Sequence, residues 1–449
     1  MAGTERREPE IPLSPAPQGA IGTAEEIEAE PNPIKKVGKI LGPGFVTGAS
    51  DDDPSGIGTY AVAGATLGLA TLWTALLTFP LMASVQSICA RVGMVSGHGL
   101  AGVLRDHYPR PLLYGSVVLL FVANTINVGA DLGAIADAVH AVIGVQTVWL
   151  VVPVAAGIVA LQIFGSYRLI CNVFKWLTLA LFAYVADAFI VRPDLAEALR
   201  ATIVPTVSLD PAYVTTIVAI LGTTISPYLF FWQSSEQVEE EIAEGRVTVA
   251  QRSGASDAEM RYSAIDTVVG MGFSNLIMYF IILATALTLF KSGETNIKSA
   301  ADAAEALKPL AGDFAGVLFA VGMIGAGLLA VPILSGSAAY AVAEAFGWRY
   351  GLDHTWSKAK EFYAVIIVAT ALGTALNFLG IDPIDALFWT AVINGVIAPP
   401  LLVLVMLAAR NERVMGDQRI GPLLTTFGWL ATVGMFLALI AFIVTSLMK

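Results

Sequence analysis

Three consecutive carboxylates, at residues 51–53, lie inside an otherwise apolar stretch near the N-terminus. The stretch reads GPGFVTGASDDDPSGIGTYAVAGATLG, residues 42–68. Pro54 follows the carboxylates and has no N–H, so the carbonyl of Ser50 loses its helical partner. An ionisable side chain at membrane depth is costly and usually functional. The pattern predicts a cation site anchored by Asp53, whereas Asp51 and Asp52 fit a solvated vestibule equally well.

A second apolar stretch, LGTTISPYLFFWQSS at residues 221–235, is interrupted by Pro227, which leaves the carbonyl of Thr223 without a partner. Such free carbonyls are tolerated in a membrane only where they face protein or a water-filled cavity. Paired interruptions indicate a binding site made of half-helices, and the C-terminal ends of half-helices attract cations. The alternative is two proline-kinked helices with structural polar residues.

The elements that position these breaks are membrane spans. The chain has 449 residues, of which 56% are hydrophobic and 14% charged, and its mean hydropathy is +0.72. Soluble domains are nearer ~25% charged, and a spanning helix needs about 20 apolar residues. With the two interrupted stretches, 40–69 and 213–233, we expect eleven spans. The other nine are 70–90, 112–127, 148–163, 173–190, 273–289, 314–333, 362–379, 387–407 and 427–448.

Several classes of protein are disfavoured. No basic cluster indicates nucleic-acid binding, and no nucleophile–base pair or phosphate-binding loop indicates an enzyme. The two cysteines do not predict a disulfide framework. Residues 1–33 are rich in Glu, Pro and Ala without an apolar core, which predicts a disordered cytoplasmic tail and no signal peptide.

The loops set the orientation. With eleven spans and the N-terminus inside, 19 of the 25 Lys and Arg residues fall on the inner side. The positive-inside rule therefore predicts a multi-pass plasma-membrane protein with a cytoplasmic N-terminus and an extracytoplasmic C-terminus. Because the breaks fall in spans one and six, we expect one transporter domain over 34–449. It divides into a first repeat at about 37–192, an inverted second repeat at about 211–409 and an extra helix at about 421–448.

The motifs resemble those of the Nramp family of divalent-metal transporters, from Gly42 to about Leu404. GPGF at 42–45 is followed after seven residues by DPSG at 53–56, where members typically carry DPGN. LTFPLMASVQSICARVGMVSG at 77–97 and IDTVVGMGFSNLIMYFIIL at 265–283 are also similar to family spans. The resemblance implies an all-α, leucine-transporter-type fold: an inverted repeat of spans 1–5 and 6–10 plus an eleventh helix. It implies a metal ion carried as substrate, no cofactor and, we expect, a monomer in the lipid bilayer.

The resemblance also implies the ligands. The family's Asp and Asn of DPGN correspond to Asp53 and Gly56, and its Ala carbonyl and Met sulfur on span six correspond to Thr223 and Ser226. The carbonyl of Ser50 comes from the proline argument. Asn394, near the family's Gln position on span ten, either contacts the ion or its waters or is a helix-packing amide.

Ser226 replaces the thioether of the family's methionine with a hydroxyl. This change favours a hard cation, because Mg²⁺ prefers oxygen ligands and keeps several waters. Gly56 removes an amide, which predicts a roomier site. The chain looks most like the divergent branch of Nramp-related magnesium transporters, with Mn²⁺ also carried. A tolerant site that still selects Mn²⁺ or Fe²⁺ is the alternative.

The family's proton path is altered. Asp131 matches its acidic residue on span three, but the next acidic position is Ala134, and the two span-six histidines are Tyr228 and Gln233. Neither replacement titrates near neutral pH, so we expect uncoupled transport, with Asp131 as a relay or a structural hydrogen-bonding group. Rivals are a proton-coupled Mn²⁺/Fe²⁺ transporter, a sodium-coupled organic solute transporter and a non-transporting sensor on the same fold. The run EQVEEEIAE at 236–244 is interpreted as a solvated acidic face. The alternative is a surface that attracts exiting cations.

Overall fold

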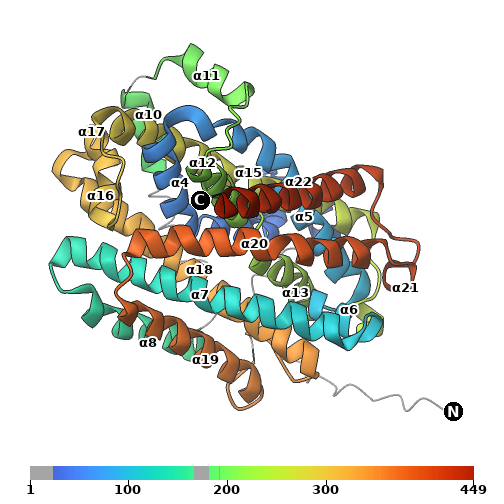
Figure 1. The fold of residues 1–449 in the computed structure, drawn as a ribbon. Coiled ribbons are helices and arrows are strands. Elements are labelled where there is room, and N and C mark those ends of the chain that lie inside the picture. The colour runs from blue at the N-terminus through green and yellow to red at the C-terminus, as the bar shows by residue number, and fades with distance from the viewer. Residues whose placement is uncertain (1–23, 166–181, 192, 353, 449) are drawn as a thin grey trace.

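A computed structural model describes residues 24–165, 182–191, 193–352 and 354–448 (Figure 1). This part of the chain is helical and contains no strand. Residues 1–23 of the expected tail and 173–181 of the expected fifth span lie outside the described residues. Long helices run side by side through the molecule, with α7 against α18 and α20 in its middle.

Nine helices or helix pairs in the described ranges are long and apolar enough to cross a membrane, so the chain is a multi-pass membrane protein. The other two predicted spans correspond to the broken pair α3–α4 and to the short apolar helix α10. The helices concerned are α3 (Pro43–Asp51), α4 (Pro54–Leu67), α5 (Trp73–Ser96), α7 (Arg110–Ile143), α8 (Thr147–Phe164), α10 (Phe182–Val191), α12 (Pro211–Thr224), α13 (Pro227–Ala243), α15 (Asp257–Thr285) continued by the π-helical η3 (Ala286–Phe290), α18 (Ala315–Phe346), α19 (Lys360–Leu376), α20 (Pro383–Arg410) and α22 (Pro422–Leu447).

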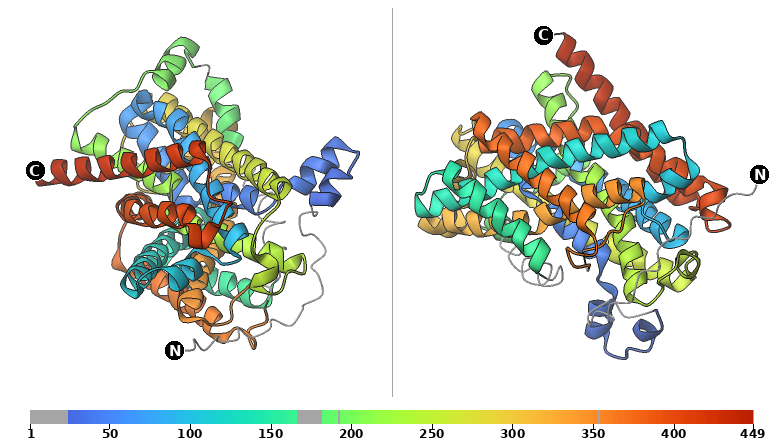
Figure 2. Two further views of the ribbon diagram at one scale, coloured as in Figure 1. Left: turned by 90° about the vertical axis from the view of Figure 1, so that its right-hand side faces the viewer. Right: turned by 90° about the horizontal axis from the view of Figure 1, so that it is seen from below.

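Shorter helices connect the spans. They are α1 (Ala24–Glu28), α2 (Pro33–Ile40), η1 (Gly68–Thr71), α6 (Leu100–His107), α11 (Leu195–Ile203), α14 (Val249–Arg252), α16 (Ala300–Ala304), η4 (Glu305–Leu307), α17 (Lys308–Ala311), η5 (Gly312–Phe314), η6 (Asn377–Leu379) and α21 (Glu412–Met415). Helices α1 and α2 stand out from the bundle in both views of Figure 2, yet Ile27 of α1 is only 1% exposed. The disordered tail predicted for residues 1–33 is therefore wrong for this part, because an apolar side chain fixes it to the bundle.

Both predicted breaks are confirmed. Helix α3 ends at Asp51 and α4 begins at Pro54, while α12 ends at Thr224 and α13 begins at Pro227. Each proline is the first residue of its second half-helix, where the absent N–H would have had no helical partner anyway. Proline therefore ends one half-helix and starts the next without a further unpaired donor.

The first half-helix, α3, is fixed at its N-terminus by a carboxylate from α15. Asp266 accepts hydrogen bonds from the backbone N–H groups of Gly42, Gly44 and Phe45, at 2.8, 2.6 and 2.9 Å. The first N–H groups of a helix have no partner within it, and an acidic group there also meets the positive end of the helix dipole. The GPGF motif is thus the sequence that lets α3 begin on Asp266, which is 2% exposed.

Glycines then hold α3 against α15 at backbone distance. A Cβ added to Gly48 would lie 2.2 Å from the carbonyl atoms of Gly270, and one added to Gly270 would lie 2.3 Å from the carbonyl oxygen of Gly44. Small residues allow membrane helices this close approach. The contact places the C-terminal end of α3, which carries the carboxylates, against the middle of α15.

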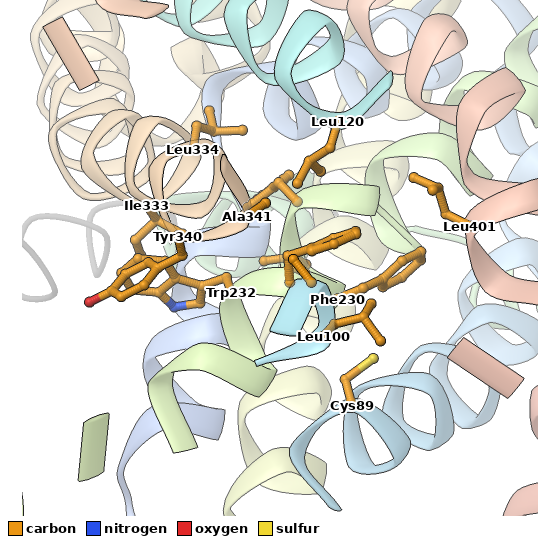
Figure 3. Packing of buried hydrophobic residues seen from close by; sticks show 14 of the residues in the cluster. Cys89, Leu100, Leu120, Phe230, Trp232, Ile333, Leu334, Tyr340, Ala341 and Leu401 are labelled. Carbon is orange, nitrogen blue, oxygen red and sulfur yellow. The ribbon is translucent and has the colours of Figure 1, made fainter. Parts of the chain in front are cut away.

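The second half-helix of the other pair, α13, is fixed by aromatic packing. Figure 3 shows Trp232 of α13 facing Tyr340 of α18 within the largest apolar cluster. The two ring centres lie 6.0 Å apart in an edge-to-face arrangement, a favoured geometry for aromatic pairs. Phe362 of α19 packs on the same tyrosine at 4.9 Å. Both half-helices are therefore held by neighbours that run unbroken through the bundle.

The glycine contact gives a stability prediction. Gly48→Ala should destabilise the protein by about 1–3 kcal/mol, because the new methyl group meets backbone that cannot move aside. The measurement is thermal unfolding of the purified protein in detergent. Gly38→Ala is the control, because nothing lies within 4 Å of a Cβ at that helical position. Equal melting temperatures for the two variants would contradict the close packing of α3 on α15.

Candidate metal site

Asp53 is the residue between the two halves of the first broken helix, and it caps the second half. Its Oδ1 accepts a hydrogen bond from the backbone N–H of Gly56 at 2.6 Å, and its oxygens accept from the hydroxyl of Ser55 at 2.8 and 2.9 Å. The residue is 1% exposed. Capping fixes the direction of the carboxylate without neutralising its charge. Asp53 is therefore a buried, oriented negative group at the predicted place.

An asparagine on α7 joins this carboxylate to a second one. The amide nitrogen of Asn127 donates to Asp53 at 3.0 Å and to Asp131 at 3.2 Å. The amide oxygen of Asn127 accepts from Asn394 of α20 at 2.9 Å. Asn394 is therefore joined to Asp53 through Asn127. Asp131 is 0% exposed, and its second oxygen has no hydrogen-bond partner among the described residues.

The second break lies directly against the first. A Cβ added to Gly56 would be 3.1 Å from the hydroxyl oxygen of Thr223, 3.2 Å from the carbonyl oxygen of Asp51 and 3.3 Å from Oδ1 of Asp53. Gly56 thus lets three oxygens from both broken helices approach one point. In this conformation the position is closely surrounded, so the extra room expected from Gly56 is not seen there. The two broken helices approach each other at Gly56 and fill the space that an asparagine side chain would occupy.

Ser226 supplies a further oxygen at the second break. It is the residue before Pro227, is 0% exposed, and its hydroxyl has no hydrogen-bond partner within the described ranges. A buried hydroxyl without a partner is costly and is expected to find a ligand or a water. Thr223, 2% exposed, lies in the last turn of α12, where carbonyl groups have no helical partner. Both residues offer hard oxygen donors.

The carbonyl of Ser50 is not free. It accepts a hydrogen bond of 2.9 Å from the hydroxyl of Tyr228, which joins α13 to the end of α3. One lone pair of that carbonyl remains for another donor or a cation. Gln233, one turn further along α13, is fully buried, and neither its amide oxygen nor its nitrogen is hydrogen-bonded in the described part of the chain.

Asp51 and Asp52 do not face a solvated vestibule. Both are 0% exposed, and the hydroxyl of Ser274 on α15 donates to one oxygen of each, at 2.6 and 3.2 Å. The remaining oxygen of each has no hydrogen-bond partner among the described residues. The vestibule interpretation is wrong because the glycine contact of α3 presses these residues against α15.

The site offers one oriented carboxylate, a backbone carbonyl and hydroxyl oxygens to a cation. In the described part of the chain no three His, Cys, Asp or Glu side chains are grouped to hold a metal ion. The described residues in this conformation therefore do not offer one metal ion four or more ligands of these types. A cation that keeps part of its water shell, held by one or two carboxylates, matches the donor set.

Sequence reasoning missed Asn127 and Ser274. Asn127 precedes Asp131 by one helical turn, so both share one face of α7, and this spacing is the signal that would have found it. Ser274 lies within the motif at 265–283, but nothing in the sequence tells which serine of a span faces a neighbouring helix. Both residues are polar groups of unbroken helices that serve the broken ones.

Comparison with known proteins agrees with this geometry. The family model for natural resistance-associated macrophage protein-like proteins, Nramp, matches residues 44–445. The chain belongs to the Nramp family. A divalent metal cation transporter MntH of Deinococcus radiodurans is 26% identical over 413 residues, which cover 90% of this chain and 89% of that protein. An MntH of Klebsiella pneumoniae is 27% identical, over 84% of this chain and 87% of the other.

Solved structures show the same fold. The Eremococcus coleocola manganese transporter, crystallised with an aromatic bis-isothiourea compound, aligns with a TM-score of 0.74 at 18% identity, over 93% of this Nramp chain and 88% of that one. MhsT with L-phenylalanine aligns with a TM-score of 0.56 at 13% identity, over 90% and 97% of the two chains. The expected all-α, leucine-transporter-type fold is confirmed.

The asparagine network gives a prediction about binding. Asn127→Ala should weaken metal binding at least tenfold, because Asp53 loses the group that orients it and three polar side chains lose a partner. The measurement is isothermal titration with Mg²⁺ and Mn²⁺ beside thermal unfolding. Asn124→Ala is the matched control: Asn124 lies on the same helix, is 1% exposed and donates only to the carbonyl of Leu334. Equal loss of affinity in both variants would show that Asn127 acts through stability alone.

Proposed function

We propose that this Nramp protein transports divalent metal ions across the membrane, with Mg²⁺ preferred and Mn²⁺ also carried. The observation that carries the proposal is the donor set at the two breaks. Asp53 supplies a buried carboxylate, Thr223 the last-turn carbonyl opposite Pro227, and Ser226 a hydroxyl without a partner. All of these donors are oxygen.

The choice of Mg²⁺ over a transition metal rests on ligand hardness. A thioether is a soft ligand that favours transition metals, whereas Mg²⁺ is bound through oxygen and sheds its waters reluctantly. One carboxylate oriented by Asn127 with neutral oxygens around it supports an ion that arrives with much of its hydration. Asp131 is joined to Asp53 through the same asparagine.

Transport without proton coupling is part of the proposal. The hydroxyl of Tyr228 donates a hydrogen bond to the carbonyl of Ser50, and the amide of Gln233 does not titrate. Histidines of the described chain lie elsewhere: His140 contacts the carbonyl of Val145 at a helix end, and His98 lies 3.8 Å from Asp106. The membrane potential is then the driving force, worth about 2.3 kcal/mol per charge at 100 mV.

A second candidate function is proton-coupled uptake of Mn²⁺ or Fe²⁺. It is favoured by the names of the relatives, which are divalent metal cation and manganese transporters. It is also favoured by Asp131, which keeps one oxygen without a partner in the described structure. Parallel measurement of metal and proton entry separates the two candidates.

We also propose a plasma-membrane location with the N-terminus in the cytoplasm. Basic residues gather at the end of the bundle that holds α1, α6, α14 and α21, among them Arg91, Arg105 and Arg252. Arg91 donates to the carbonyl of Gln418, which joins the loops of that end. The positive-inside rule then assigns this end to the cytoplasm.

Asp53→Asn should abolish metal uptake while leaving the fold intact, because asparagine caps a helix about as well as aspartate but carries no charge. The measurement is Mg²⁺ entry into proteoliposomes under a K⁺ diffusion potential, with internal Mg²⁺ and pH dyes read in parallel. The unsubstituted protein should carry Mg²⁺ in without acidification. Normal flux in Asp53→Asn would remove Asp53 from the site, and acidification that tracks metal entry would favour the second candidate.

Ser226→Met should shift selectivity from Mg²⁺ toward Mn²⁺ by about tenfold, an effect of roughly 1.4 kcal/mol, because a thioether is a soft ligand. The measurement is competition between the two ions in the same flux assay. Adding Gly56→Asn should cost activity, since its Cβ meets three oxygens at 3.1–3.3 Å. Ser226→Ala is the control, which removes the hydroxyl without adding sulfur. Unchanged selectivity in Ser226→Met would refute the hardness argument.

A further inference from the structure

The segment that joins α10 to α12 forms a separate helix of nine residues, α11 (Leu195–Ile203). The carboxylate of Asp194 accepts hydrogen bonds from the backbone N–H groups of Ala196 and Glu197, at 2.9 and 3.2 Å. Arg200 lies in the last turn, where a cation meets the negative end of the helix dipole. Local contacts therefore stabilise both ends of this helix, which is far too short to cross a membrane.

One side of α11 faces the bundle. Ala198 is 5% exposed, and the helix packs against α5 and η1. The hydroxyl oxygen of Thr202 lies 3.1 Å from the hydroxyl oxygen of Tyr279 on α15. Residues four apart lie on the same side of a helix, so Ala198 and Thr202 define the side that is fixed to protein.

A second side of α11 carries an exposed apolar stripe. It consists of Leu195, Leu199 and Ile203, which follow one another at the same spacing of four and are 75%, 60% and 59% exposed. The loop that follows adds Val204 and Val207, which are also exposed. Exposed apolar surface of this extent marks a contact with a membrane or with another protein.

The charged residues of α11 occupy the third side. Glu197 and Arg200 are both exposed. Glu197 precedes Leu199 by two residues, which places the two side chains on nearly opposite sides of the helix. A helix with one side on protein, one apolar side and one charged side suits the surface of a bilayer, because protein, lipid and water meet there.

The stripe continues the lipid-facing surface of the neighbouring helices. Phe189 and Ile190, at the end of α10, are exposed, and so are Leu76 and Leu77 of α5, on which α11 packs. Helix α5 is long and apolar enough to cross a membrane, so its exposed leucines face lipid. Figure 1 shows α11 at the edge of the bundle, where lipid can reach it.

We propose that α11 binds the surface of the phospholipid bilayer, with Leu195, Leu199 and Ile203 inserted among the head groups and the upper acyl chains. Amphipathic helices of this kind bury their apolar side by about 5–10 Å. The bilayer is the partner because the stripe adjoins lipid-facing side chains of both α10 and α5. Glu197 and Arg200 then lie on the side of the helix that faces water.

This anchor acts on the second broken helix. The segment after α11 is attached to α12, because the hydroxyl of Tyr213 donates to the carbonyl of Thr206. The indole of Trp73, next to η1 at the start of α5, donates to the hydroxyl of Tyr213 at 3.2 Å. Helix α12 carries Thr223 at its other end. The bilayer surface therefore holds the start of α12, and with it one half of the second break, at a fixed depth.

The test places a fluorescent label on the full chain in vesicles of phosphatidylcholine. Cys89→Ala and Cys171→Ala remove the native cysteines, and Leu199→Cys or Glu197→Cys supplies a single labelling site. We expect a lipid with a nitroxide near its head group to quench the label at position 199 about threefold more strongly than at position 197, because only the apolar side enters the bilayer. Dissolved iodide should quench the two labels in the reverse order.

Thermal unfolding of each labelled protein shows whether it is folded, and Leu195→Cys, on the same stripe, replaces Leu199→Cys if the latter is not. Equal quenching by iodide at positions 199 and 197 would overturn the proposal, because the stripe would then lie in water. Protection of position 199 from both quenchers would also overturn it, since protein, such as a second copy of this chain, would then cover the stripe. Neither result depends on which ion is transported.

Discussion

The structure depends on one constraint: a backbone group inside a membrane needs a hydrogen-bond partner, and two proline breaks remove partners at the centre of the bundle. Side chains of other residues bond several of the backbone N–H and carbonyl groups at the ends of the half-helices. Asp53 accepts from the N–H of Gly56 in the first turn of α4, Tyr228 donates to the carbonyl of Ser50, and Asp266 accepts from the N–H groups of Gly42, Gly44 and Phe45 at the start of α3. The hydroxyl of Ser226 has no hydrogen-bond partner among the described residues, and the carbonyl of Thr223 lies in the last turn of α12, at the second break. The candidate site is thus made of polar groups that the two breaks bring together.

The unbroken helices supply hydrogen-bond partners for the groups at the two breaks. Helix α7 brings Asn127, whose amide meets Asp53, Asp131 and Asn394 at once, so one residue ties the site to two long helices. Helix α15 brings Ser274 and Asp266, and its Gly270 permits contact with the backbone of α3. These contacts are short-range and directional, so they fix the carboxylate more precisely than apolar packing alone. Precision matters here because an ion and its waters are recognised by distances of tenths of an ångström.

The sequence predicted the breaks to the residue, because proline acts locally: its missing N–H and its preference for the first helical position need no knowledge of neighbours. It also predicted the spans that the structure describes, since about 20 apolar residues suffice to recognise one. It missed Asn127 and misjudged Asp51, Asp52 and the acidic run. Each of those outcomes depends on which helix lies opposite, as with Ser274 beside the two aspartates or α15 beside Glu241. The folded segment at residues 24–33 was not predicted for the same reason, since Ile27 is buried only in the assembled bundle.

Helix α13 connects the second break to the acidic run. Near the break, the hydroxyl of Tyr228 donates to the carbonyl of Ser50 at the end of α3. In the middle of the helix, Trp232 packs on Tyr340 of α18. The acidic run at its end is not the solvated face expected from the sequence, because Glu241 is 5% exposed and lies 3.6 Å from Arg246. Contacts along the whole half-helix therefore fix its position, and with it the position of the break relative to α3.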